Sequence, residues 1–79
     1  MCIARRKTGF AQFYSDLYPD TGSGTDLAVI DAIKKCMNGA SKKDAMGCNI
    51  HSCYRGATTT SIPTSVGDLI WDVYKKMFL

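Results

Sequence analysis

The sequence has no long apolar run, and this absence is the first limit on what the chain can be. No stretch approaches the roughly 18 apolar residues that a membrane-spanning helix requires. The basic residues Arg5, Arg6 and Lys7 are not followed by the roughly 7–15 apolar positions of a signal peptide. We therefore expect either an intracellular chain or the mature form of a secreted chain carrying an added start methionine.

Motifs for nucleotide binding and for acid–base catalysis are also missing. There is no P-loop, and Gly22-Ser23-Gly24 has no strand before it, so it is not a dinucleotide fingerprint. The seven acidic residues are scattered singly, which argues against a paired-carboxylate site. A nucleophilic pair of Cys48 and His51, the only histidine, lacks an identifiable third group to orient it. We predict a non-enzymatic protein with no catalytic residues and no cofactor.

The positive charge is mild and lies in short clusters. Ten Lys and Arg residues against seven acidic residues give a net charge of +3. A nucleic-acid-binding module usually carries a stronger basic stripe, so nucleic acid is not the expected partner. An anionic membrane surface or a protein receptor fits this charge better, and the plainest alternative is a solvated surface with a small excess of lysine. The clusters are Arg5-Arg6-Lys7, Lys34-Lys35 with Lys42-Lys43, and Lys75-Lys76.

The length of the chain limits it to one small domain. We predict a single domain over 1–79, with a basic arm at 1–8 and a threonine-rich connector at 57–64. One core of this size supplies only about 3–5 kcal/mol of stability unless something staples it.

Four cysteines in so short a chain provide either two disulfides or one metal site. On a helix, Cys48 and Cys53 lie too far apart to bond to each other, given a Cα–Cα limit of about 7 Å. Two pairings remain. A helical hairpin turning near Gly39 favours Cys36–Cys48 with Cys2–Cys53 over Cys2–Cys48 with Cys36–Cys53. Each bridge is expected to add about 2–4 kcal/mol.

The metal alternative uses three cysteines and the histidine, a donor set suited to zinc. The common zinc fingers have closely spaced ligand pairs at both ends, and here one end is the lone Cys36. If the segment is helical, Cys53 points roughly 140° away from Cys48, which is poor geometry for one tetrahedral ion. Zinc is therefore the second choice, with the ligands Cys36, Cys48, His51 and Cys53.

Hydrophobic periodicity predicts helices along most of the chain. A helix is predicted over 8–18, because five apolar residues recur there on one helical face. Three more helices are predicted after Ser23, Ser41 and Ser65, each of which precedes an aspartate by three residues, as in a capping box. The helix after Ser41 ends near Arg55, or already near Gly47. The apolar residues of the first helix are Phe10, Phe13, Tyr14, Leu17 and Tyr18.

These elements predict an all-α fold, a small bundle of three to four short helices stapled by two disulfides. The helix after Ser65 is expected at the centre, with Trp71 as its anchor. The alternative is an α+β fold with strands at 3–14 and 50–61.

The helix after Ser65 is also the best functional candidate. Its apolar residues cover about 200° of a helical wheel, which is broader than a one-sided surface helix needs. Such a face can dock in a partner groove or enter a membrane interface. The predicted interaction surface combines aromatic residues of this helix with the basic arm: Trp71, Tyr74, Phe78, Arg5, Arg6 and Lys7.

Size, cysteine density and charge together predict a small secreted protein that binds a membrane or a protein receptor, as a toxin, effector or signal does. The alternative is an intracellular zinc-stabilised regulator that binds protein or nucleic acid.

Overall fold

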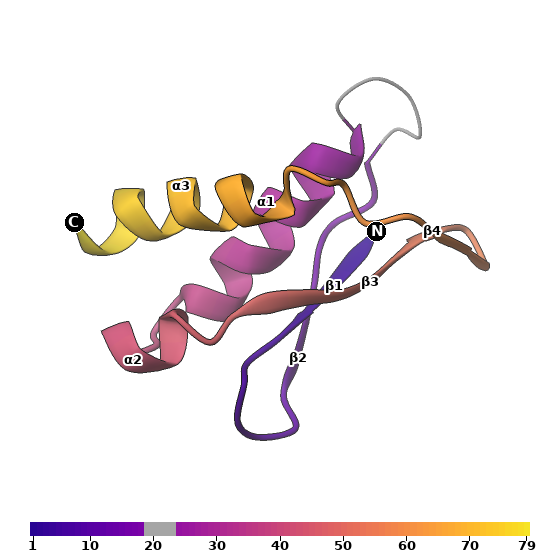
Figure 1. Ribbon diagram of the computed structural model, residues 1–79. Helices are drawn as coiled ribbons and strands as arrows, with labels where there is room; N and C mark the ends of the chain where they lie inside the picture. The colour runs from indigo at the N-terminus through magenta and orange to yellow at the C-terminus, as the bar shows by residue number, and fades with distance from the viewer. Residues whose placement is uncertain (19–23) are drawn as a thin grey trace.

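The fold is α+β, so the predicted all-α bundle is wrong and the alternative fold class is the one adopted. The computed structural model describes residues 1–18 and 24–79. Each of the two predicted strands, 3–14 and 50–61, is in fact a hairpin of two short strands. Along the described chain the elements are β1 (Cys2–Arg5), β2 (Gln12–Tyr14), α1 (Gly24–Met37), α2 (Lys42–Ala45), β3 (Asn49–Arg55), β4 (Thr58–Thr60) and α3 (Val66–Phe78) (Figure 1).

The strands form one antiparallel sheet in the order β2-β1-β3-β4. Two hairpins, β1–β2 and β3–β4, pair through their first strands, so β1 and β3 lie at the centre. β1 therefore comes from the segment predicted as a basic arm, and β4 lies in the predicted connector.

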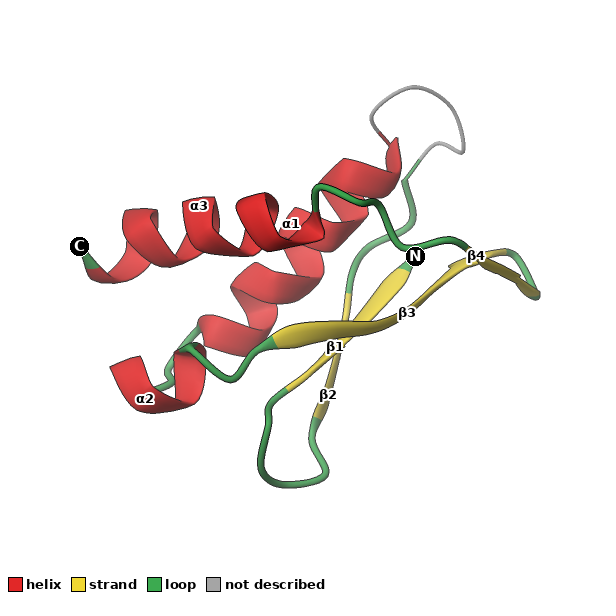
Figure 2. Cartoon of the chain, viewed as in Figure 1, coloured by secondary structure: helices red, strands yellow, loops and turns green. Residues whose placement is uncertain are grey.

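Helix α1 is the central helix of the molecule. It packs against the sheet on one side and against α3 on the other (Figure 2). Its buried residues recur at helical spacing and include the small Ala28 and Ala32, which allow close approach of its neighbours. Of α3, only Val73 is fully buried, and Trp71 keeps 52% of its surface exposed. The prediction that α3 is central, with Trp71 as anchor, is wrong.

A β-bulge explains why β3 resembles a helix in the sequence. Ala4 pairs with Ile50 and Ile3 pairs with Ser52, so His51 is an extra residue on β3. An extra residue restores the inward direction after three positions instead of two. Ile50 and Cys53 are therefore both buried although they are three residues apart. The predicted helix over this segment is wrong for that reason.

Both disulfides hold β3, one at each end. Cys2 and Cys53 lie opposite each other on β1 and β3, with their Cα atoms 4.0 Å apart. Cys48, directly before β3, bonds to Cys36 of α1. The favoured pairing is thus the one formed, and all four cysteines are buried.

The segment 8–18 is not a helix. Gly9 has φ +94°, a left-handed conformation that glycine adopts without a steric penalty, and it lies in the loop between β1 and β2. Phe10 and Leu17 are almost fully exposed. Ser15 is buried, and its hydroxyl accepts a hydrogen bond of 2.8 Å from the Cys2 amide. This bond holds the end of the β2 strand against β1.

The three predicted caps have different outcomes. Ser41 is the N-cap of α2, and its hydroxyl accepts a hydrogen bond from the Asp44 amide, as predicted. That helix ends at Ala45, close to the earlier of the two predicted ends. Ser65 lies at the start of α3 but makes no capping hydrogen bond through its side chain. Ser23 lies outside the described residues.

Candidate interaction surface on the C-terminal helix

Three aromatic rings form a continuous row along one flank of α3. The Trp71 and Tyr74 ring centroids are 5.5 Å apart, and those of Tyr74 and Phe78 are 5.3 Å apart. Both pairs are stacked, which is a favourable arrangement of aromatic side chains. Residues at spacings of three and four share a helix face, so the sequence places these rings side by side. We call Trp71, Tyr74 and Phe78 the aromatic row; the structure brings these three predicted surface residues together.

An open apolar groove lies beside the aromatic row, between α3 and α2. Its volume is about 230 Å³. Trp71 and Tyr74 line it from α3, and Met46, which follows α2, lines it from the opposite element. Gly67 also borders the groove, and a Cβ atom at this position would meet nothing within 4 Å. The groove is therefore left open in part because position 67 has no side chain.

Met46 was not among the residues predicted for the interaction surface, yet 73% of its surface is exposed and it lines the groove. The signal that identifies it is Gly47, because a glycine after a four-residue helix marks the end of that helix and exposes the residue before it.

A basic hollow adjoins the other side of Met46. It has a volume of about 450 Å³ and contains Arg5, Arg6 and Lys7 together with His51. A further hollow places Lys7 and Lys43 beside Met46. Met46 thus lies where apolar and basic surfaces meet.

Arg6 is held by the fold. Its Nε and Nη2 atoms donate hydrogen bonds of 3.2 and 3.0 Å to the Cys36 carbonyl at the end of α1. Its guanidinium carbon lies 5.1 Å from the centroid of the Phe13 ring, within range of a cation–π contact. Arg6 therefore joins β1, β2 and α1, whereas Arg5 and Lys7 are exposed.

The C-terminal ends of α1 and α3 also lie close together. Lys34 and Lys35 of α1 line one hollow with Met77 of α3. On α3, Lys75 lies 5.9 Å above the Trp71 ring and 3.5 Å from an Asp72 carboxylate oxygen. The basic clusters that are separate in the sequence thus border the same end of the fold.

An ion-pair cluster holds the segment that follows β2 against α1. The Asp31 carboxylate accepts a 2.8 Å hydrogen bond from the Asp16 amide and lies 3.1 Å from Lys35 Nζ. Burial acts to raise the pKa of Asp31, but the Asp16 amide and the Lys35 ammonium outweigh it, so this pKa lies below its ordinary value. The hydrogen bond to Asp31 in turn raises the pKa of Lys35. Asp31 and Lys35 are four residues apart on α1, a spacing at which opposite charges pair on a helix.

The predicted zinc ligands include no free thiolate. Cys36, Cys48 and Cys53 are all bonded to other sulfurs, and His51 is exposed on the bulge of β3. Within residues 1–18 and 24–79, no group of three or more His, Cys, Asp or Glu side chains is arranged to hold a metal ion.

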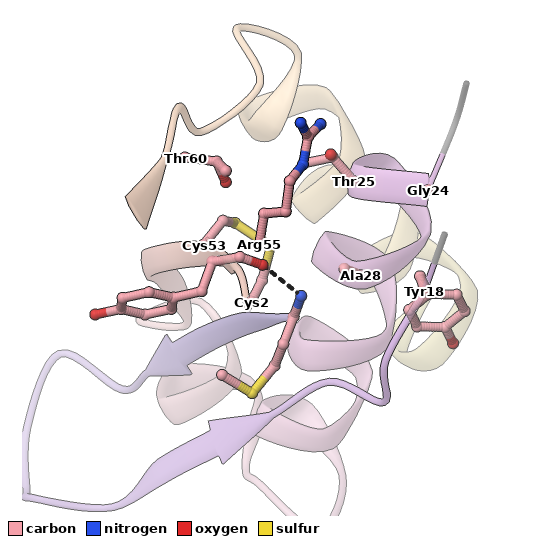
Figure 3. A pocket seen from close by; sticks show the side chains of 10 residues that line it. Cys2, Tyr18, Gly24, Thr25, Ala28, Cys53, Arg55 and Thr60 are labelled. Carbon is pink, nitrogen blue, oxygen red and sulfur yellow. Dashed lines mark hydrogen bonds between the residues drawn. A yellow bond between two sulfur atoms is a disulfide. The ribbon is translucent and has the colours of Figure 1, made fainter. Parts of the chain in front are cut away.

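A small pocket lies beside the Cys2–Cys53 bridge (Figure 3). Its volume of about 50 Å³ is enough for a few water molecules. Thr25, Arg55 and Thr60 line it, and the Met1 ammonium donates a 2.9 Å hydrogen bond to the Tyr54 carbonyl at its edge. Its size makes it a poor site for an organic ligand.

No helix in the described part of the chain has both the length and the apolar character to cross a membrane. No protein-family model matches the sequence, and neither a curated protein nor a solved structure is found to match this chain.

Proposed function

We propose that the chain is a small secreted protein that acts by binding a membrane or a protein receptor, and not by catalysis. The observation that carries the proposal is the aromatic row beside an open apolar groove. A chain of 79 residues has few apolar side chains for its core. Leaving Trp71 and Met46 half or more exposed is costly unless another surface covers them.

The disulfides support the secreted part of the proposal. Two buried bridges in a small domain are typical of proteins that fold in an oxidising compartment. Their position at both ends of β3 supplies stability that the small core lacks. Because the bridges supply this stability, the fold does not need every apolar residue of α3 in its core, and the exposed ones can contact another molecule.

The non-catalytic part is supported by how the reactive residues are used. All four cysteines are in disulfides, so the Cys48–His51 pair has no free thiol. His51 faces an open hollow about 450 Å³ in volume beside Arg5 and Lys7, a setting that attracts anions and does not exclude water.

The experiment measures binding of the intact protein to bacterial, fungal and animal cells. Protein that sediments with the cells is quantified by mass spectrometry. The test variant carries Met46→Ser and Trp71→Ser, which remove two exposed apolar side chains beside the groove. The matched control carries Phe10→Ser and Leu17→Ser, which remove two exposed apolar side chains elsewhere.

We expect saturable binding to at least one cell type, a loss of at least about tenfold in the test variant, and a change within about twofold in the control. Thermal melts show whether both variants remain folded. Absence of binding to every cell type, or equal loss in the two variants, would contradict the proposal.

A further inference from the structure

We propose that the target of this surface is an anionic phospholipid membrane, with Met46 and Trp71 entering the headgroup region and lysines contacting the lipid phosphates. This inference rests on the proposed function and names its target. The inference rests on one arrangement: the apolar groove and the basic hollows meet at the exposed side chain of Met46.

The apolar and basic surfaces are continuous around Met46. This side chain lines the groove with Trp71, the hollow that contains Arg5, and the hollow that contains Lys7 and Lys43. A lipid headgroup region presents the same combination, with phosphate next to hydrocarbon. The lipid phosphate would face the basic hollows, and the lipid hydrocarbon would face the apolar groove.

The type of cation favours a membrane over a protein partner. Lysine is depleted in the cores of protein–protein interfaces, where arginine is preferred. Arg6 is already engaged within the fold, because its guanidinium donates to the Cys36 carbonyl. Three lysines adjoin the apolar residues, Lys7 and Lys43 beside Met46 and Lys75 over the Trp71 ring, whereas Arg5 and Arg6 share one hollow with Met46. Lysine side chains extend their charge toward a membrane surface while their alkyl stems pack on apolar groups.

The balance of charge favours an anionic membrane. All seven lysines are exposed, and they lie just beyond β1 or on α1, α2 and α3. Three acids near these lysines are paired: Asp16 and Asp31 both with Lys35, and Asp72 with Lys75. Asp44 is the acid that shares a hollow with Met46. The seven lysines are Lys7, Lys34, Lys35, Lys42, Lys43, Lys75 and Lys76.

Tryptophan emission gives a direct test, because Trp71 is the only tryptophan in the chain. The intact, disulfide-bonded protein is titrated with vesicles of phosphatidylcholine alone and with vesicles containing phosphatidylglycerol. We expect a blue shift of Trp71 emission and co-sedimentation with the anionic vesicles only. Raising the salt from 0.1 to 1 M shortens the Debye length from about 10 to about 3 Å and should weaken this binding.

Paired charge variants test which face is used. The test variant carries Lys7→Gln and Lys43→Gln, beside Met46. The control carries Lys34→Gln and Lys76→Gln and loses the same charge; Lys76 is roughly 140–160° around α3 from the aromatic row. Each lysine at an anionic surface contributes about fivefold to partitioning, so the test variant should bind about 25-fold more weakly. The control should lose clearly less.

Several outcomes would overturn the inference. Equal binding to neutral vesicles removes the anionic requirement, and equal loss in the two charge variants removes the assignment to this face. Binding to cells without binding to any vesicle, especially if protease treatment of the cells abolishes it, assigns the surface to a protein receptor. That last result leaves the proposed function intact, whereas absence of binding to both cells and vesicles contradicts both proposals.

Discussion

The two disulfides should differ in the stability they contribute, and the difference can be worked from the loops they close. Cys2–Cys53 spans a sequence separation of 51, and Cys36–Cys48 spans 12. At 25 °C, the loop-closure relation gives about 4 kcal/mol for the long loop and about 3 kcal/mol for the short one. Each value is comparable with the roughly 3–5 kcal/mol expected from so small a core.

The perturbation is removal of one bridge at a time by paired Cys→Ala substitution. All four residues are at most 3% exposed, so the loss of packing is similar in the two variants and largely cancels in their comparison. The remaining difference, about 1 kcal/mol, reflects loop length. For a domain of this size it corresponds to a Tm difference of roughly 4–8 °C.

The assay is thermal and urea unfolding of both variants and the wild type, followed by circular dichroism and by Trp71 emission. Cys2→Ala with Cys53→Ala should give the lower Tm, by the roughly 4–8 °C that the loop-length difference implies. If Cys36→Ala with Cys48→Ala is equally or more destabilised, loop entropy does not govern the contribution of these bridges. Sucrose can be added to raise all three stabilities if the weaker variant is unfolded from the start.

Three further perturbations test local features, each against a matched change. Ser41→Ala removes the α2 cap and should lower the free energy of unfolding by about 1 kcal/mol, whereas Ser65→Ala, which loses no capping bond, should change it little in urea titrations. Gly47→Ala should destabilise the protein, because the new Cβ would lie 2.9 Å from Lys7 Cβ. Gly67→Ala has open space and should raise the free energy of unfolding by up to about 1 kcal/mol through the better helix propensity of alanine. Because the folded-state pKa of Asp31 is depressed, its contribution is present above its unfolded pKa of about 4 and is lost as pH falls through the lower folded value. Urea midpoints measured from pH 6 down to pH 2 should therefore fall less steeply in Asp31→Asn than in the wild type; equal slopes would contradict this assignment.

Local signals in the sequence predicted the helices after Ser23, Ser41 and Ser65, but the same periodicity predicted a helix over 8–18 that does not form. The periodicity of α1 and α3 and the cap at Ser41 correspond to observed elements. These signals succeed because they depend on neighbours three or four residues away. The ion pair between Asp31 and Lys35 depends on the same local spacing.

The strands failed because their signals are not local. The bulge at His51 gives β3 the spacing of a helix, since Ile50 and Cys53 both face inward. The pairing Cys2–Cys53 was predicted for the wrong reason: a helical hairpin was assumed, whereas the two residues are partners across β1 and β3. A bulge is fixed by the partner strand, which no window of the sequence contains.

The helix with the widest apolar arc is not the most buried helix, and this difference carries the functional argument. α1 lies between the sheet and α3, and small residues such as Ala28 and Ala32 give it two close neighbours. α3 packs closely against α1 and only borders an open groove with α2, so a narrow part of its arc is covered, and Trp71 lies outside that part. The sequence does give α3 a broad apolar arc, but the conclusion that this arc places α3 at the centre of the core was wrong. Apolar surface in excess of what the fold covers is the property expected of a helix that docks on something else.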